Sequence, residues 1–268
     1  MLKQRIITAI ILGSIIVFVI LKLPNSSIAI IFGVITLVGA WEWSTLIGAH
    51  TFLKKLFYVG LAGAFVLTIW FFVEPELEKL ILLAASLWWA CVVILLSLYK
   101  SEWLRSSRLQ TLLKFSGFLV LVPAWLALIE LHKISPAMLM FLLVLIWVAD
   151  ISAYFVGKRF GKNKLAAELS PGKSREGVLG ALLASIVVAL IGMQLLSIDK
   201  QVGFYFVGLC LLTALISVVG DLYESLLKRK AGAKDSGTIL PGHGGVLDRI
   251  DSLTAAAPGY VLGLYWLL

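Results

Sequence analysis

Long apolar runs separated by short polar breaks make up most of the chain. Runs of about 20 apolar residues, each long enough to cross a hydrocarbon layer of roughly 30 Å, recur along its whole length. This pattern predicts an all-α fold, a polytopic integral membrane bundle of about nine transmembrane helices. The expected helices span residues 6–23, 28–48, 56–73, 80–99, 113–131, 136–157, 178–198, 204–227 and 252–268.

Lysines and arginines divide unevenly between the loops on the two sides of this expected bundle. With nine helices, 19 of the 23 fall on the side of the N-terminus, and the other side has only Lys22, Lys79, Lys133 and Lys200. Cytoplasmic loops carry an excess of basic residues, so we expect the N-terminus in the cytoplasm and the C-terminus outside.

Composition supports the bilayer as the main solvent, since 60% of the residues are apolar, 14% are charged and the mean hydropathy is +1.01. The net charge of +8 does not indicate nucleic acid, because the basic residues lie in short loops between apolar runs. We expect anionic lipids and phosphates as ligands. We expect a single membrane domain, with residues 1–135 as a lipid-facing scaffold of five helices and residues 136–268 carrying the active site.

Carboxylates inside the expected spans are candidates for chemistry, because each costs about 2.5 to 3.5 kcal/mol on insertion. Asp150 and Asp221 both lie about seven residues before the cytoplasmic end of their helix, roughly 10 Å below the surface. Tyr154 shares a helical stripe with Asp150, and Glu224 and Lys228 share one with Asp221. A structural network that locks the bundle would explain one such residue, whereas two stripes at matched depth favour a site.

A third intramembrane carboxylate, Glu42, lies between two tryptophans in the second expected helix. No acidic residue lies near it in the sequence. We therefore expect a structural role for Glu42.

The segment 225–251 combines glycines, cations and carboxylates in one cytoplasmic stretch. Gly242, Gly244 and Gly245 allow backbone amides to approach a polyphosphate just before the last helix. Asp248 and Asp251 are three residues apart, so they share a helical face on which oxygen ligands hold a hard cation. The cations expected to meet phosphate are Lys228, Arg229, Lys234 and Arg249.

Two further features belong to the expected site. His243 alone is a poor metal site, and we expect it to donate to a phosphate or to fix the glycine turn. Lys173 and Ser174 lie in an ordered polar turn, residues 170–177, where they could also meet phosphate.

The segment 225–251 resembles the signature of the phosphatidate cytidylyltransferase family. Every fixed position of that signature is filled, by Ser225, Lys228, Arg229, Lys234, Asp235, His243, Gly244, Gly245, Asp248, Arg249 and Asp251. Supporting similarity comes from residues 150–157, 160–161, 170–177 and 220–224. The resemblance is strong over residues 147–252, and the first half agrees only as a hydrophobic bundle. Gly172 departs from the family, which more often has a lysine there.

The resemblance implies transfer of CMP from CTP to phosphatidate, which gives CDP-diacylglycerol and pyrophosphate in phospholipid biosynthesis. It implies Mg²⁺, with a second cation left open, a bacterial inner membrane location, an active site on the cytoplasmic side and a homodimer. Asp221, Asp248, Lys228 and Arg249 are the expected catalytic residues. The expected metal ligands are Asp221, Asp248, Asp251 and Glu224. The expected substrate-binding residues are Ser225, Arg229, Lys234, Asp235, Gly242, His243, Gly244, Gly245, Lys173, Ser174, Asp150 and Tyr154.

An ion- or proton-coupled transporter is the alternative, because intramembrane carboxylates also carry ions. A transporter predicts related halves and polar groups near the midplane. The sequence has no convincing repeat, and its candidate residues crowd one cytoplasmic edge.

Overall fold

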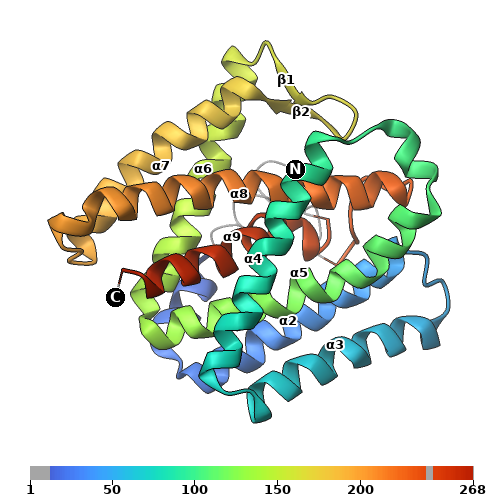
Figure 1. Cartoon of the computed structure of the whole chain (residues 1–268), viewed down its shortest axis with the longest axis horizontal. Coiled ribbons are helices and arrows are strands. Elements are labelled where there is room, and N and C mark those ends of the chain that lie inside the picture. The colour runs from blue at the N-terminus through green and yellow to red at the C-terminus, as the bar shows by residue number, and fades with distance from the viewer. Residues whose placement is uncertain (1–12, 240–243, 268) are drawn as a thin grey trace.

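The computed structural model describes residues 13–239 and 244–267. Figure 1 shows an almost entirely helical bundle. Seven described helices are long and apolar enough to cross a membrane. They are α2 (Asn25–Leu46), α3 (Phe52–Phe72), α4 (Pro75–Ser97), α5 (Ser107–Ile134), α6 (Pro136–Phe160), α7 (Arg175–Leu195) and α8 (Gly203–Lys230). The short 3-10 helix η2 (Lys200–Val202) leads into α8.

Two further helical segments lie before and after these seven. Gly13–Lys22 is apolar but shorter, and residues 6–12 of the first expected helix lie outside the described residues. The last helix, α9 (Leu247–Tyr265), carries Asp248, Arg249 and Asp251 near its start and is not among the seven. It begins five residues before the expected start at 252. The expected all-α membrane bundle is confirmed, and seven spans are identified among the described residues.

The polar segment between α6 and α7 forms a short β-hairpin that the sequence did not predict. Strand β1 (Lys164–Ala166) pairs antiparallel with β2 (Ser170–Ser174), with Lys164 opposite Ser174. We expected an ordered turn here, and the structure has a short hairpin. Its second strand leads directly into α7, where the Ser174 hydroxyl accepts a hydrogen bond from Gly177 N at 3.1 Å and caps the helix.

Small residues set the closest helix contacts. A Cβ on Gly177 would lie 2.8 Å from the Ala153 carbonyl oxygen, and one on Gly180 would lie 2.6 Å from the Val156 side chain. Close backbone approach of this kind is how helices associate inside a membrane, where apolar surface alone gives no preference for protein over lipid. Glycine therefore allows α6 and α7 to pack tightly below the hairpin.

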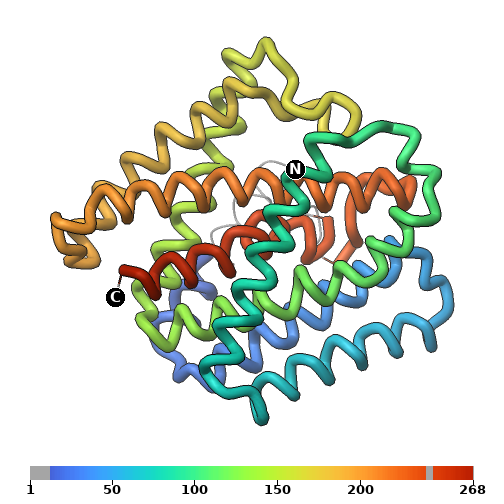
Figure 2. The backbone as a smooth tube through the Cα atoms, viewed as in Figure 1, coloured from blue at the N-terminus to red at the C-terminus, as the bar shows by residue number. Residues whose placement is uncertain are grey.

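The helices run back and forth between two ends of the bundle, as the tube in Figure 2 shows. At one end, the C-terminal end of α8 contacts the 3-10 helix η1 (Ser101–Arg105) and the residue after it, where Lys230 Nζ lies 3.2 Å from the Ser106 carbonyl oxygen. The hairpin and the start of α9 lie at this end too. At the opposite end, Tyr265 donates a hydrogen bond to Glu130 at 3.1 Å.

Candidate active site

The site is built on the crossing of α8 and α9. A Cβ on Gly220 would lie 2.4 Å from the Asp251 carbonyl oxygen and 2.8 Å from Ala255, so only glycine fits. This contact brings Asp221 and Glu224 of α8 next to Asp251 of α9. Burial, followed by the neighbouring carboxylates of Asp221 and Glu224, raises the pKa of Asp251 well above its ordinary value. Three of the four predicted metal ligands thus lie together.

Lys228 joins this group to the fourth predicted ligand. Its ammonium lies 2.7 Å from Asp248 Oδ1 and 3.2 Å from Glu224 Oε2, and all three side chains are at most 13% exposed. The Lys228 ammonium therefore lies between Asp248 and Glu224, so the four predicted ligands do not surround a single position.

Asp248 is enclosed by donors on its second oxygen. Oδ2 accepts hydrogen bonds from Ser236 N at 2.9 Å, Ser236 Oγ at 2.9 Å and Gly245 N at 2.8 Å. Burial alone raises the pKa of Asp248, but the hydrogen bonds from Lys228, Gly245 and Ser236 outweigh burial and bring the pKa below its ordinary value. Asp248 therefore stays ionised. Gly244, with φ of +83°, turns the backbone around this carboxylate.

The hairpin supplies a second cation. Lys173 Nζ lies 2.7 Å from Asp221 Oδ2, and Ser225 Oγ lies 3.4 Å from the other oxygen of Asp221. Arg229 holds the hairpin turn through a 3.2 Å hydrogen bond from its Nε to the Leu169 carbonyl oxygen. Lys173, predicted to bind phosphate from sequence, is therefore next to the α8 carboxylates, although 48 residues separate it from Asp221.

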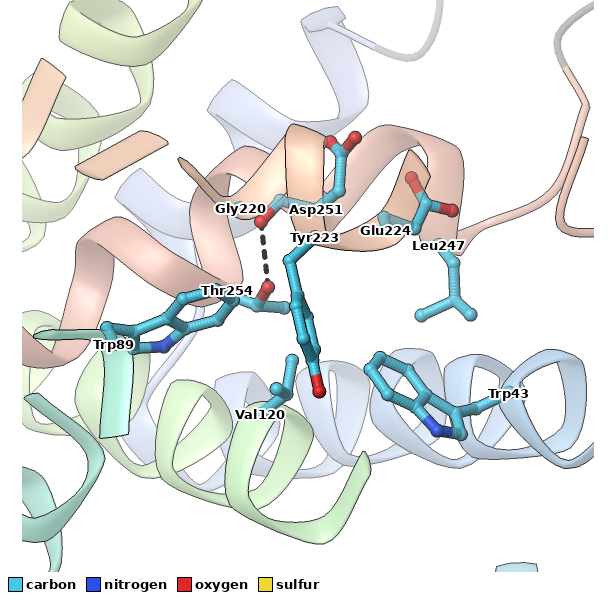
Figure 3. A pocket seen from close by; sticks show the side chains of 9 residues that line it. All are labelled: Trp43, Trp89, Val120, Gly220, Tyr223, Glu224, Leu247, Asp251 and Thr254. Atoms are coloured by element: carbon cyan, nitrogen blue, oxygen red, sulfur yellow. Dashed lines mark hydrogen bonds between the residues drawn. The ribbon is translucent and has the colours of Figure 1, made fainter. Parts of the chain in front are cut away.

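Aromatic side chains close the site from below. Figure 3 shows the Glu224 and Asp251 carboxylates above the rings of Trp43, Trp89 and Tyr223. Together they line a cavity of about 10 Å³, near the smallest volume that holds one water. A cavity of this size has no room for a charged substrate.

The donor set suits a divalent cation even though no preformed cage is present. Among the described residues, no group of three or more Asp, Glu, His or Cys side chains is arranged to hold a metal ion. However, Glu224 Oε1 is buried and receives no hydrogen bond within the described chain. Carboxylate oxygens are the ligands that Mg²⁺ prefers, and Asp221 and Glu224 both lie near Asp251. The side chains of Asp221, Glu224 and Asp251 are therefore of the kind that holds a divalent cation.

Other predicted residues lie around this cluster. Asp150 is exposed on α6, near Lys173 and Asp221. Lys234, Asp235 and Arg249 are exposed. Tyr154 is also exposed, and its ring contacts are Phe155 and the Lys158 ammonium at 5.7 Å from the ring centre. Gly242 and His243 lie outside the described residues.

Two residues at the site were not predicted to act there. Glu42 of α2 accepts hydrogen bonds from Val246 N and Leu247 N at 3.0 and 2.8 Å, and Ser236 lies between Glu42 and Asp248. The sequence does place Glu42 inside an expected membrane span, which is unusual for a glutamate and could have marked it as a site residue. Nothing in the residue pattern distinguished Ser236 from other loop serines.

A helical membrane bundle with a carboxylate and lysine cluster at one end is typical of a membrane enzyme that handles phosphates. The chain matches the model of the cytidylyltransferase family over residues 3–267, and it belongs to this family.

Its relatives are more specific. The chain is 40% identical over 275 residues to the phosphatidate cytidylyltransferase of Pseudomonas aeruginosa, covering 99% of this chain and 97% of the relative. It is 36% identical over 290 residues to that of Haemophilus influenzae, with both chains covered completely. It is 48% identical over 130 residues, about half of each chain, to that of Helicobacter pylori. The family that the segment 225–251 resembles is confirmed.

Proposed function

We propose that this protein is a phosphatidate cytidylyltransferase. The observation that carries the proposal is the cluster of Asp221, Glu224, Asp248 and Asp251 with Lys173 and Lys228, in a chain matched along its full length by enzymes of that name. The comparisons do not support the transporter alternative.

The reaction is a displacement at phosphorus. A phosphate oxygen of phosphatidate attacks the α-phosphorus of CTP, the bond from that phosphorus to the bridging oxygen of the β-phosphate breaks, and pyrophosphate leaves with the electron pair. The attacking phosphate monoester is already ionised, so the reaction needs no strong base. Catalysis consists of positioning the two phosphates and neutralising their charge.

The site residues divide this work by their charge. Lys228 and Lys173 hold the phosphates, and each is oriented by a carboxylate at 2.7 Å. The exposed Arg229, Lys234 and Arg249 meet the phosphates from the cytoplasm. Asp221, Glu224 and Asp251 are the residues that would hold Mg²⁺, with Asp248 as a further ligand and a second cation left open. The ion supplies charge neutralisation of the triphosphate.

The membrane arrangement follows from the charge bias. We propose nine spans, with the N-terminus in the cytoplasm, the C-terminus outside and the site at the cytoplasmic face of a bacterial inner membrane. The exposed basic residues of the hairpin and of the α8 end support this orientation. A homodimer is part of the proposal on the strength of the family resemblance alone.

The test uses purified protein in detergent with Mg²⁺, phosphatidate and CTP labelled at the α-phosphate. Label should move into the organic phase as CDP-diacylglycerol, and both chelation of Mg²⁺ and omission of phosphatidate should stop the transfer. CTP labelled at the γ-phosphate is the matched control, because that label leaves with pyrophosphate and stays in water. A folded protein that moves no α-label into lipid would refute the proposed function.

A further inference from the structure

Glu42 has the properties of a residue that organises the site from the first half of the chain. Its side chain is buried, with 3% of the residue exposed, in the last turn but one of α2. Burying a carboxylate in a membrane bundle is costly unless strong donors surround it. The described donors to Glu42 all come from residues more than 190 positions later in the chain.

The first of these donors are the free amides at the start of α9. Val246 N donates to Glu42 Oε1 at 3.0 Å and Leu247 N donates to Oε2 at 2.8 Å. The residue at the N-cap position is Val246, whose apolar side chain cannot accept a hydrogen bond from these amides. The first amides of a helix need acceptors, and a negative charge is favoured at that end of the helix dipole. Glu42 is thus the N-terminal cap of the helix that carries Asp248 and Asp251.

Two glycines of the signature segment make room for this carboxylate. A Cβ on Gly237 would lie 2.4 Å from Glu42 Oε1, and a Cβ on Gly245 would lie 2.6 Å from both oxygens of Glu42. Real side chains do not approach oxygen that closely. The sequence suggested that Gly245 lets the backbone approach a polyphosphate, and the structure shows that it lets the backbone approach Glu42.

Ser236 connects Glu42 to Asp248. Its hydroxyl lies 3.1 Å from Glu42 Oε2 and 2.9 Å from Asp248 Oδ2, and its amide donates to the same Asp248 oxygen. A serine hydroxyl has one proton, so it donates to one of the two carboxylates at a time. The line of contacts continues from Asp248 through Lys228 to Glu224. A change at Glu42 therefore reaches the charged groups of the site through Ser236 and through the start of α9.

We propose that Glu42 is a positioning residue for cytidylyl transfer, which holds Ser236, Gly245 and the start of α9 so that Asp248 orients Lys228 toward the substrate phosphates. The proposal rests on the proposed function. It assigns a role in the reaction to α2, which lies in the half of the chain that we expected from the sequence to be a scaffold. Glu42 touches no reacting atom in this scheme and acts only through the alignment of Asp248 and Lys228, so its loss lowers turnover more than it weakens CTP binding.

The experiment compares Glu42→Gln with Glu130→Gln, since Glu130 is a second buried glutamate, 8% exposed, at the opposite end of the bundle. The glutamine at position 42 keeps the shape but loses the charge and sets an amide NH₂ against backbone donors. We expect kcat to fall about 10- to 100-fold, the range seen when residues that orient catalytic groups are lost. KM for CTP and for phosphatidate should change less than about threefold, and Glu130→Gln should keep wild-type kinetics.

A double-mutant cycle separates positioning from general stability. Ser236→Ala should also lower kcat, and Glu42→Gln combined with Ser236→Ala should be little worse than Glu42→Gln alone, because both changes break the same connection. Glu42→Asp keeps the charge on a shorter side chain and should recover part of the lost kcat. Thermal unfolding of Glu42→Gln in detergent should lie somewhat below that of Glu130→Gln, because the start of α9 loses its charged acceptor, so kcat is compared per folded protein.

The outcomes are distinct. Wild-type kcat in Glu42→Gln, or fully multiplicative losses in the cycle, would overturn the positioning role while leaving the proposed function intact. The same follows if Glu42→Gln loses folded protein in proportion to activity, since the role would then be structural. A wild-type protein that transfers no label would overturn the proposed function and, with it, the role of Glu42.

Discussion

The two ends of the bundle each bury a glutamate but satisfy it in different ways. At the end away from the site, Glu130 accepts from Lys133 Nζ at 3.2 Å and from Tyr265 OH at 3.1 Å. Lys133 lies one turn further along the same helix and is 58% exposed at the side chain. This glutamate is paired by neighbours that need no particular loop conformation, and Lys133 and Tyr265 are both donors to it.

Among the described contacts at the site end, carboxylates outnumber the lysines that pair with them. Four acidic side chains, Asp221, Glu224, Asp248 and Asp251, share Lys173 and Lys228, and one Glu224 oxygen has no donor in the described chain. Such an excess is costly in a bundle unless a ligand completes it. The contrast separates a contact that stabilises helix packing from a cluster whose charges suit the cation and phosphates of the proposed function.

The largest effect on activity is expected when one negative charge is removed at the site end. Asp248→Asn keeps the shape, and its carbonyl oxygen can still accept from Ser236 and Gly245. Its NH₂ group, however, faces the Lys228 ammonium, which lies 2.7 Å from Asp248 Oδ1. We expect transfer of label from CTP to lipid to fall about 10³-fold or more. The midpoint of thermal unfolding should fall as well, because the buried Lys228 ammonium loses one of its anionic partners. Activity within tenfold of wild type would rule out a role for Asp248 in the reaction.

Removal of a shared cation should have the next largest effect. Lys228→Met leaves Glu224 and Asp248 buried without their ammonium, and breaking a buried pair costs about 3 to 5 kcal/mol of stability. We expect a clearly lower midpoint of thermal unfolding, together with a loss of kcat of about 100-fold.

The matched control for that change lies at the opposite end. Lys79 pairs with Glu76 at 3.1 Å, but the two side chains are 46% and 83% exposed. Lys79→Met should therefore change stability by less than about 1 kcal/mol and leave activity intact. Equal destabilisation by the two lysine changes would contradict the distinction between the ends.

Features of the fold and site that depend on neighbouring residues can be predicted from the sequence, whereas features that depend on residues far apart in the chain cannot. The spans were predictable because an apolar run about 20 residues long is a local property, and the end of α9 that carries Asp248 and Asp251 was found by its motif. The hairpin at 164–174 was missed because its strands are short and polar, without apolar alternation. Glu42 was placed in the scaffold because its partners follow it by more than 190 residues, and only the folded chain brings them together.

The charge excess also depends on how closely α8 and α9 approach, which can be changed without touching a charge. Gly220→Ala places a Cβ 2.4 Å from the Asp251 carbonyl oxygen, so the helices must separate and Asp251 moves away from Asp221. We expect about 1 to 3 kcal/mol of destabilisation and a loss of activity of about tenfold. Gly208→Ala is the control in the same helix, because its Cβ would meet nothing within 4 Å. Equal behaviour of the two variants would show that the spacing of α8 and α9 does not matter.

The smallest effect is expected from Glu130→Gln, which tests whether the end of the bundle away from the site contributes to activity. The substitution keeps an acceptor for Tyr265 OH but removes the charge that faces Lys133, so thermal unfolding should shift by no more than about 1 kcal/mol, as for other partly exposed pairs. Activity with CTP and phosphatidate should be unchanged, because the described contacts of Glu130 lie at the end of the bundle away from Asp221 and Asp248. A loss of kcat in this variant would mean that the two ends are coupled through the helices. Glu130 would then belong to the same functional unit as the site.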